Sequence, residues 1–372
     1  MKELIHSKRK WLLLLAPLGL ILITMAKQNV EFVERVFSLG IYRVLSIGIS
    51  YMTSLVPVSL SEIIVILLPF VFLLSIGITI ARIIKKRGKR RLIALNYVMN
   101  LLCFLSVMYF GYVLLCGLNY YRYPFSYYSK LEIKESSVEE LYALCSDLAT
   151  LAKDLRQQVP TTDEVGNFKL SISNYEAGKI AREAMNELGE VYPVFAGWHA
   201  KPKPIIFSKV MSMGETTGIF IPYTMEANVN VHIPDYSIPS TMCHELSHLR
   251  GFMREDEANF ISFLACMYSD HVEFQYSGVL EALILAGNAL YSQDVEKYRE
   301  LRNNYGPDVD GDLIANSYYW KEFEDTVIST VATQVNDTYL KANNQTDGVQ
   351  SYGRMVDLLL AWYDQYGLEF PK

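Results

Sequence analysis

Three long apolar stretches in the first third of the chain restrict its fold more than any other feature. They occupy residues 11–26, 63–80 and 92–118. A helix that spans a bilayer needs about 20 mostly apolar residues, and each stretch is that long or nearly so. We therefore expect three transmembrane helices and a lipid bilayer as a partner. The first stretch would also suit a signal peptide, but it lacks a clear cleavage site and is followed by Lys27.

Basic residues border these stretches and predict how the chain crosses the membrane. One cluster precedes the first stretch, and a second, at 82–91, forms the short loop between the second and the third. Cytoplasmic loops are enriched in lysine and arginine, so both clusters favour the cytoplasm. Three spans satisfy both and place the remainder of the chain outside the cytoplasmic membrane. The loop would alternatively contact nucleic acid or anionic lipid. Membrane topology explains it better, and we expect no nucleic-acid partner.

The charges divide the chain into two parts. Residues 1–118 contain fourteen lysines and arginines against four acidic residues, whereas the remainder contains twenty against thirty-six. We expect a membrane domain over 1–123 and an extracytoplasmic domain over 124–372. Segment 30–56 combines an apolar stripe with charged residues. This pattern predicts an amphipathic helix on the outer face of the membrane, and a fourth, poor span is the alternative.

The outer domain has the sequence pattern of an α+β protein. Ser137 and Glu140 form a capping-box pattern ahead of leucines at helical spacing. Short β-like segments at 205–212, 218–221 and 227–233 precede further helical stretches. The expected fold is therefore three N-terminal transmembrane helices followed by a helix-rich domain with a small β-sheet.

The sequence H-E-x-x-H at 244–248 is the strongest indication of function. His244 and His248 are four residues apart, so on a helix both imidazoles can reach one metal ion. Glu245 lies beside the first ligand and can take a proton from a metal-bound water. The pattern is typical of zinc hydrolases, and we expect Zn²⁺ as the cofactor.

A catalytic zinc ion usually has three protein ligands, so a third must follow the motif. Arg254 occupies the position where some metallopeptidases carry a third histidine, and arginine cannot bind zinc. Glu255 and Glu257 are the next candidates. Glu255 is favoured, because Asn259 shares its helix face and can hydrogen-bond a ligand imidazole from there. Glu257 points away from Asn259, and we expect it to be solvated or bound to the helix N-terminus.

This arrangement resembles the gluzincin branch of zinc peptidases, in which a second helix after H-E-x-x-H carries a glutamate. The resemblance implies His244 and His248 as ligands, Glu245 as the catalytic base and Glu255 as the third ligand. Asn259 stands where that branch usually has an aspartate. The longer string His-Glu-Leu-x-His-x-Arg-Gly-x-x-Arg-Glu-Asp-Glu-Ala-Asn-Phe and the three spans also resemble an uncharacterised family of bacterial membrane proteins within the zincin group. That resemblance extends along most of the chain and implies a zincin-like outer domain.

These features predict a membrane-anchored zinc metallopeptidase that hydrolyses peptides or proteins at the outer face of the cytoplasmic membrane. Two alternatives stay open: a metal-binding or degenerate zincin-fold sensor or scaffold, and a hydrolase of a non-peptide amide in the cell envelope. Segment 218–231 would supply an edge strand to which an extended peptide adds, or would be ordinary sheet. The sequence does not choose among the candidates for stabilising the oxyanion, which are His199, His232, His271, Tyr223 and Tyr352.

Overall fold

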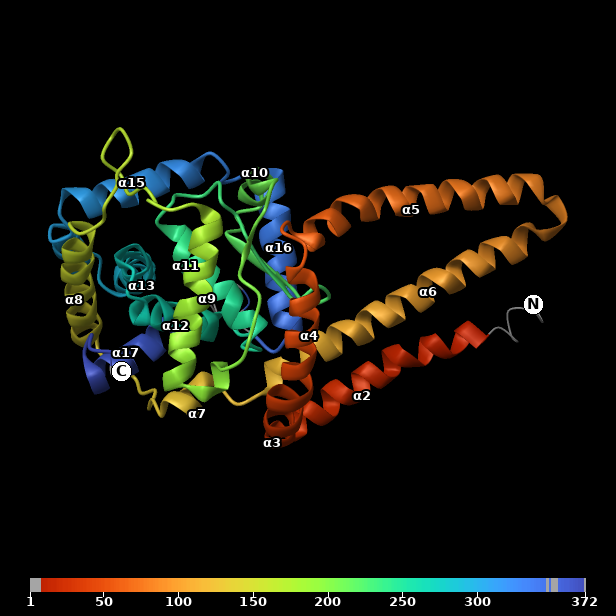
Figure 1. Ribbon diagram of the computed structural model, residues 1–372, viewed down its shortest axis with the longest axis horizontal. Coiled ribbons are helices and arrows are strands. Elements are labelled where there is room, and N and C mark those ends of the chain that lie inside the picture. Colours follow the sequence, from red (N-terminus) through yellow and green to blue (C-terminus); the bar gives the residue numbers. More distant parts are fainter. Residues whose placement is uncertain (1–7, 346–347, 349–353, 371–372) are drawn as a thin grey trace.

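Long apolar helices at the N-terminal end and a helix-rich domain make up the protein in a computed structural model (Figure 1). The structure describes residues 8–345, 348 and 354–370. Among these residues, four helices are long and apolar enough to cross a membrane, namely Lys8–Gln28, Val30–Ser54, Leu60–Lys85 and Arg87–Leu115. Apolar helices suited to a lipid bilayer are therefore confirmed. By length and composition there are four candidates, one more than the three expected spans.

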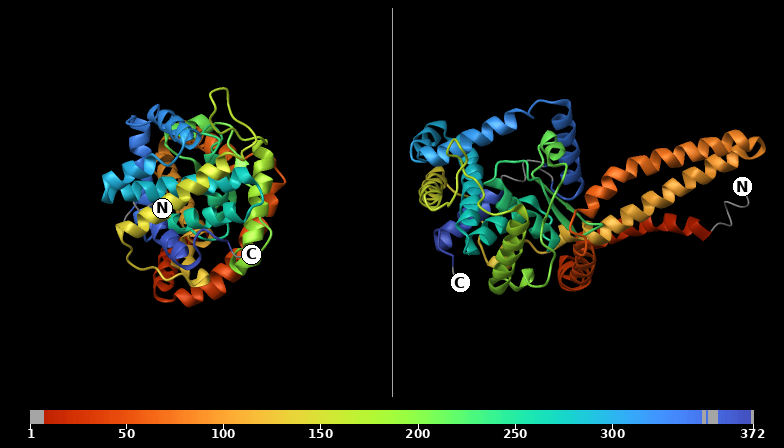
Figure 2. Two further views of the ribbon diagram at one scale, coloured as in Figure 1. Left: turned by 90° about the vertical axis from the view of Figure 1, so that its left-hand side faces the viewer. Right: turned by 45° about the horizontal axis from the view of Figure 1, so that its top comes forward.

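The second candidate differs from the other three in its direction and its burial. Figure 1 and Figure 2 show α2 (Leu15–Gln28), α5 (Leu60–Lys85) and α6 (Arg90–Leu115) extending together from the domain. Val30–Ser54 instead runs across their base, against the domain. A third of its apolar window is buried (33%), whereas none of the window in Leu60–Lys85 is. The amphipathic helix expected at 30–56, with a fourth span as its alternative, stays a prediction. The elements within it are α3 (Val30–Phe32), η2 (Val33–Tyr42) and α4 (Arg43–Ser54).

The first turn of α5 is fixed to the sheet of the helix-rich domain. Ser59 caps the helix by accepting a hydrogen bond from the Glu62 amide at 3.0 Å. The Glu226 carboxylate accepts two more bonds, from the amides of Leu60 and Ser61 at 3.1 and 2.8 Å. Lys203 pairs with Glu226 at 2.6 Å, and both side chains are buried. The domain therefore holds this apolar helix through the orphan amides of its N-terminus.

Three largely buried helices form the centre of the helix-rich domain: α11 (Ser237–Leu249), α12 (Glu255–Tyr268) and α13 (Val272–Gln293). The capping box at Ser137 is confirmed at the start of α8, where both reciprocal bonds form. The remaining helices are α7 (Phe125–Ser129), α8 (Val138–Arg156), α9 (Asn174–Val191), α10 (Ser208–Met213), α14 (Val295–Arg302), α15 (Pro307–Lys321), α16 (Val327–Ala342) and α17 (Met355–Tyr366). Short helical turns are η1 (Lys8–Leu14), η3 (Arg87–Lys89), η4 (Gly117–Tyr121) and η5 (Pro193–Phe195).

A three-stranded sheet with the order β1-β3-β2 lies before the central helices. Its strands are β1 (Lys203–Pro204), β2 (Gly218–Ile221) and β3 (Glu226–Val229). β3 pairs parallel with β1 and antiparallel with β2, so β2 is an edge strand. The expected strands at 218–221 and 227–233 are confirmed, the second in part. The strand expected at 205–212 is wrong, because α10 begins at Ser208 and most of the apolar side chains that suggested a strand are exposed. The helix-rich fold with a small sheet agrees with the α+β class.

Candidate metal centre

A sharp turn after α11 sets the geometry of the site. Pro239 lies in the first turn of this helix, and nearly the whole helix is buried. Gly251 follows its end with φ at +91°, a conformation that other residues rarely adopt. A side chain there would also meet Arg122 and Tyr42, at 3.0 and 3.1 Å. The chain therefore reverses tightly, and α12 begins at Glu255, opposite the motif.

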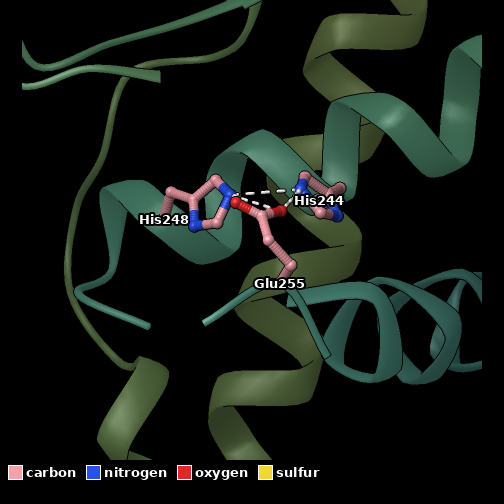
Figure 3. A group of neighbouring side chains, drawn as sticks. All are labelled: His244, His248 and Glu255. Carbon is pink, nitrogen blue, oxygen red and sulfur yellow. Dashed lines mark hydrogen bonds and ion pairs between the residues drawn. The ribbon is translucent and has the colours of Figure 1, made fainter. Parts of the chain in front are cut away.

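His244, His248 and Glu255 converge on one point between α11 and α12 (Figure 3). The Nε2 atoms of the two histidines are 3.1 Å apart. Glu255 Oε2 lies 3.1 Å from the first of them and 3.6 Å from the second. A tetrahedral zinc ion with bonds of about 2.0–2.1 Å would separate its ligand atoms by roughly 3.3 Å. The three side chains therefore form a group that can hold a metal ion.

Hydrogen bonding prepares His248 for this role. Its Nδ1 donates to the backbone carbonyl of Phe252 at 2.8 Å, which orients the ring so that Nε2 faces the site. Burial lowers the pKa of His248, but the Glu255 carboxylate outweighs burial and raises it to about 9. Burial likewise raises the pKa of Glu255, and the two histidines overcome this and hold it well below its usual range. The buried group therefore attracts positive charge, as a cation site must.

Glu245 projects from the same helix and is 3% exposed. Burial raises its pKa to about 7, although the neighbouring histidines lower it. One carboxylate oxygen, Oε2, is buried without a hydrogen-bond partner among the residues described here. Gly218 of β2 lies directly against this carboxylate. A Cβ on residue 218 would be 2.8 Å from Glu245 Cδ and closer still to Oε1. The free oxygen is available to accept a proton.

The converging side chains line a cavity of about 890 Å³. β2, α11, α12, α13 and α16 contribute to its wall, together with the outer end of α6. Glu281 of α13 is a further carboxylate in this wall that the sequence did not reveal. Burial raises its pKa, while a hydrogen bond from Ser237 and the charge of His244 lower it. No spacing relative to the motif identifies such a residue, because it comes from a helix that packs against α11 only in the folded chain.

The other two predicted residues of the α12 helix differ in their outcome. Asn259 lines the same cavity as Glu255. Within the described part of the chain no hydrogen bond joins it to either imidazole, so its orienting role stays a prediction. Glu257 lies outside the metal group and is buried, and its Oε1 accepts a bond from the Phe125 amide at 3.0 Å. The expectation of a solvated Glu257 is wrong, because its carboxylate is buried and bound to the first amide of α7.

Of the candidates for stabilising an oxyanion, Tyr223 lines the cavity. Its hydroxyl donates to the backbone carbonyl of Met108 in α6 at 2.8 Å. His199, His232 and His271 do not line it, and Nδ1 of His232 lies 2.8 Å from the hydroxyl of Tyr319. Tyr352 lies outside the described residues. The cavity wall also contains tyrosines that the sequence did not single out, at Tyr112, Tyr120 and Tyr339.

Comparison with known proteins assigns the chain to a family. Residues 37–360 match the family described as "Protein of unknown function (DUF3810)", which covers most of the chain. The protein therefore belongs to this family, which agrees with the expected resemblance to an uncharacterised family. No curated protein and no solved structure shows a significant match.

Proposed function

We propose that this member of the DUF3810 family is a membrane-anchored zinc metallopeptidase that acts at the outer face of the cytoplasmic membrane. The observation that carries the proposal is the convergence of His244, His248 and Glu255 beside Glu245. Two nitrogens and one carboxylate oxygen suit zinc, and three protein ligands leave a position for a water or a substrate. The fit supports a zincin-like outer domain, as the resemblance implies.

In the proposed hydrolysis, Glu245 transfers the proton and a bound metal ion activates the carbonyl and the water. A bound zinc ion would supply a Lewis acid that polarises the scissile carbonyl and acidifies a water. Glu245 accepts a proton from water at its unpartnered Oε2. The hydroxyl adds to the carbonyl carbon, the C–N bond breaks, and Glu245 returns the proton to the leaving amine. Peptide and water thus become a carboxylic acid and an amine, which ionise to a carboxylate and an ammonium group.

The edge strand β2 offers a binding surface for an extended peptide. It is paired on one side, with β3, and lines the cavity from Gly218 to Ile221. Phe220 of this strand lies over His248, with the ring centroids 6.4 Å apart. A peptide that adds to the free edge would gain backbone hydrogen bonds and pass beside Glu245. Peptide or protein is therefore the substrate class we favour over a non-peptide amide.

The proposed topology has three spans and a helix on the outer surface. The turn between α5 and α6 and the start of the first helix point away from the outer domain, toward the same end of the bundle (Figure 1). Both ends are rich in lysine and arginine, which favours the cytoplasm for them and the exterior for the domain. Val30–Ser54 then lies along the outer interface, which its direction and partial burial support.

The test is proteolysis of a degenerate peptide library by the full-length, zinc-loaded protein and by its Glu245→Gln variant. We expect the wild type to cleave library peptides, and the variant to bind zinc with the same stoichiometry while losing at least about 10³-fold in rate. Cleavage by both proteins alike would reject the mechanism. Bound zinc without any turnover would instead favour a sensor or scaffold.

A further inference from the structure

The cavity that holds the metal group reaches the membrane part of the protein. Tyr112 of α6 and the residues Cys116 and Tyr120 just beyond this helix line it. The hydroxyl of Tyr112 donates to Asn343 Oδ1 at 2.5 Å and lies 3.3 Å from the hydroxyl of Tyr339 in α16. One wall of the cavity is therefore the outer end of an apolar helix, joined directly to α16.

The two long helices α5 and α6 give independent estimates of where the bilayer ends. A hydrocarbon core takes about 20 helical residues, and its cytoplasmic limit lies near the last basic side chain. Counting about 20 residues outward from Arg91 in α6 reaches Gly111. Counting the same number from Arg82 in α5 reaches Glu62. The outer surface of the hydrocarbon core is therefore level with Gly111 and Glu62.

Two parts of the outer domain lie at this level. The Glu62 carboxylate accepts bonds from the amides of Ile206 and Phe207, at 3.1 and 2.8 Å. Tyr223, in the turn between β2 and β3, reaches Met108, which precedes Gly111 on α6. The segment before α10 and the β2–β3 turn therefore lie at the edge of the bilayer, and the turn contributes Tyr223 and Pro222 to the cavity wall.

Exposed apolar side chains surround this side of the cavity. Ile206, Phe207 and Val210 are 57–69% exposed. Apolar residues of α16 that are 54–82% exposed follow at helical spacing, at Val327, Ile328, Val331 and Val335. The buried residues of α16, Ser329 and Leu340, fall on its opposite face. Figure 1 and Figure 2 show α16 on the side of the domain from which the membrane helices extend. The bilayer is the surface that this apolar face would contact, since α16 is bonded to α6.

We propose that the cavity opens onto the bilayer and takes polypeptides tethered to the outer leaflet by an apolar anchor. This inference rests on the proposed peptidase function and names its substrate class. A water-soluble peptide would have to approach past exposed apolar side chains held against lipid. A tethered polypeptide arrives along the membrane surface, with its anchor in the hydrocarbon and its first extended residues beside β2.

The length of β2 predicts where such a substrate is cut. Its membrane end lies at Ile221 and the turn beyond, near Tyr223, whereas Gly218 covers the catalytic Glu245. Ile221 and Tyr223 follow Gly218 by three and five residues, which corresponds to about 10–17 Å of extended chain at 3.3 Å per residue. A substrate paired with β2 therefore presents a peptide bond about three to five residues from the bilayer surface.

The experiment uses full-length, zinc-loaded protein in liposomes with three substrates that share one randomised segment. The segment is attached to a transmembrane helix, attached to a diacylated cysteine, or left free. We expect cleavage of the tethered forms at least ~10-fold faster than that of the free form. Mass spectrometry of the products should place most cuts three to five residues from the anchor, whichever sequence follows it. Cleavage of one tethered form only would also support the bilayer route and would identify the anchor.

A tethered substrate could be cleaved faster because α16 contacts the lipid or only because tethering raises its local concentration. Variants of α16 separate these two causes. Ile328→Asp and Val331→Asp charge the exposed apolar face without altering the cavity wall. We expect them to slow cleavage of tethered substrates about tenfold and to spare the free peptide, because charge is costly at the bilayer surface. Thr330→Asp, on the polar face of the same helix, is the matched control. Equal rates for free and tethered peptides, with cuts unrelated to the anchor, would overturn this inference and leave the peptidase intact. Zinc-bound wild type that cleaves none of the three would overturn the proposed function itself.

Discussion

Replacement of Gly218 by alanine tests whether the position of Glu245 governs activity. The Cβ of an alanine would lie 2.8 Å from both Cγ and Cδ of Glu245, and closer to Oε1. Carbon atoms prefer separations of about 3.5–4.0 Å, so the carboxylate must retreat by roughly 1 Å. It has little room to do so, because it is 3% exposed.

The expected loss follows from this displacement. Misplacing a catalytic group by about 1 Å can reduce the rate by 10²-fold, which corresponds to about 2.7 kcal/mol of transition-state stabilisation. We expect Gly218→Ala to lower kcat by about this factor on a peptide cleaved by the wild type. Zinc stoichiometry should not change, since the three atoms nearest to the new methyl group all belong to Glu245, which is not one of the proposed ligands.

Gly214→Ala provides the matched control on the same segment. Its Cβ would meet the side chain of Ala332 at 3.4 Å, an ordinary contact, and Gly214 also lines the cavity. We expect its kcat to stay within about twofold of the wild type. A Gly218→Ala enzyme with wild-type kcat at full zinc occupancy would refute the assignment of Glu245 as a precisely positioned base.

Four further substitutions separate the metal site from its structural support. Glu255→Gln should abolish stoichiometric zinc binding, whereas Glu257→Gln should retain it. Elemental analysis of the purified variants measures the zinc content. Zinc loss in Glu257→Gln alone would make Glu257 the third ligand in place of Glu255. Asp312→Asn should destabilise the domain by about 3–5 kcal/mol, because it removes the negative charge that compensates the buried guanidinium of Arg156. Thermal unfolding measures this loss, and an unchanged Tm would contradict it. Tyr42→Phe removes a hydroxyl 3.2 Å from two backbone carbonyls at the end of α11. It should lower the free energy of unfolding by about 1 kcal/mol in the same assay. An unchanged Tm would show that this contact does not stabilise the domain.

The site could be predicted from the sequence as far as local helix geometry determines it. Residues four apart on α11 share a face, so His244 and His248 follow from the spacing alone. Glu255 follows from its place at the start of the next helix, once the turn at Gly251 is recognised. Glu281 could not be found in this way, because α13 reaches the site through tertiary packing.

The fold was predictable where one strong local signal dominated, and not where tertiary contacts decided. The capping box of α8 and the apolar runs of α5 and α6 are such signals. The apolar residues of segment 205–212 suggest a strand, but α10 forms there, because contacts such as the bond from the Phe207 amide to Glu62 of α5 come from the folded chain and not from local pattern.

No sequence pattern predicts the contacts that join η2 to the end of α11. Glu34 of η2 is buried and pairs with Arg122 at 2.6 Å. Arg122 in turn donates to the backbone carbonyl of Arg250, directly after α11, at 3.3 Å. The N-terminal helical part therefore supports the site through residues far apart in the sequence. Helical periodicity describes only neighbours along one helix, so it cannot predict such contacts.

Zinc content together with the X-ray absorption spectrum of the bound metal tests the central claim most directly. The full-length wild type should contain one zinc ion per chain, with two imidazole nitrogens and light oxygen ligands at about 2.0–2.2 Å. A chelator should remove the ion and lower the Tm, and added zinc should restore both. A correctly folded protein that binds no divalent metal, or that binds zinc with His244 and His248 both replaced by alanine, would contradict the account.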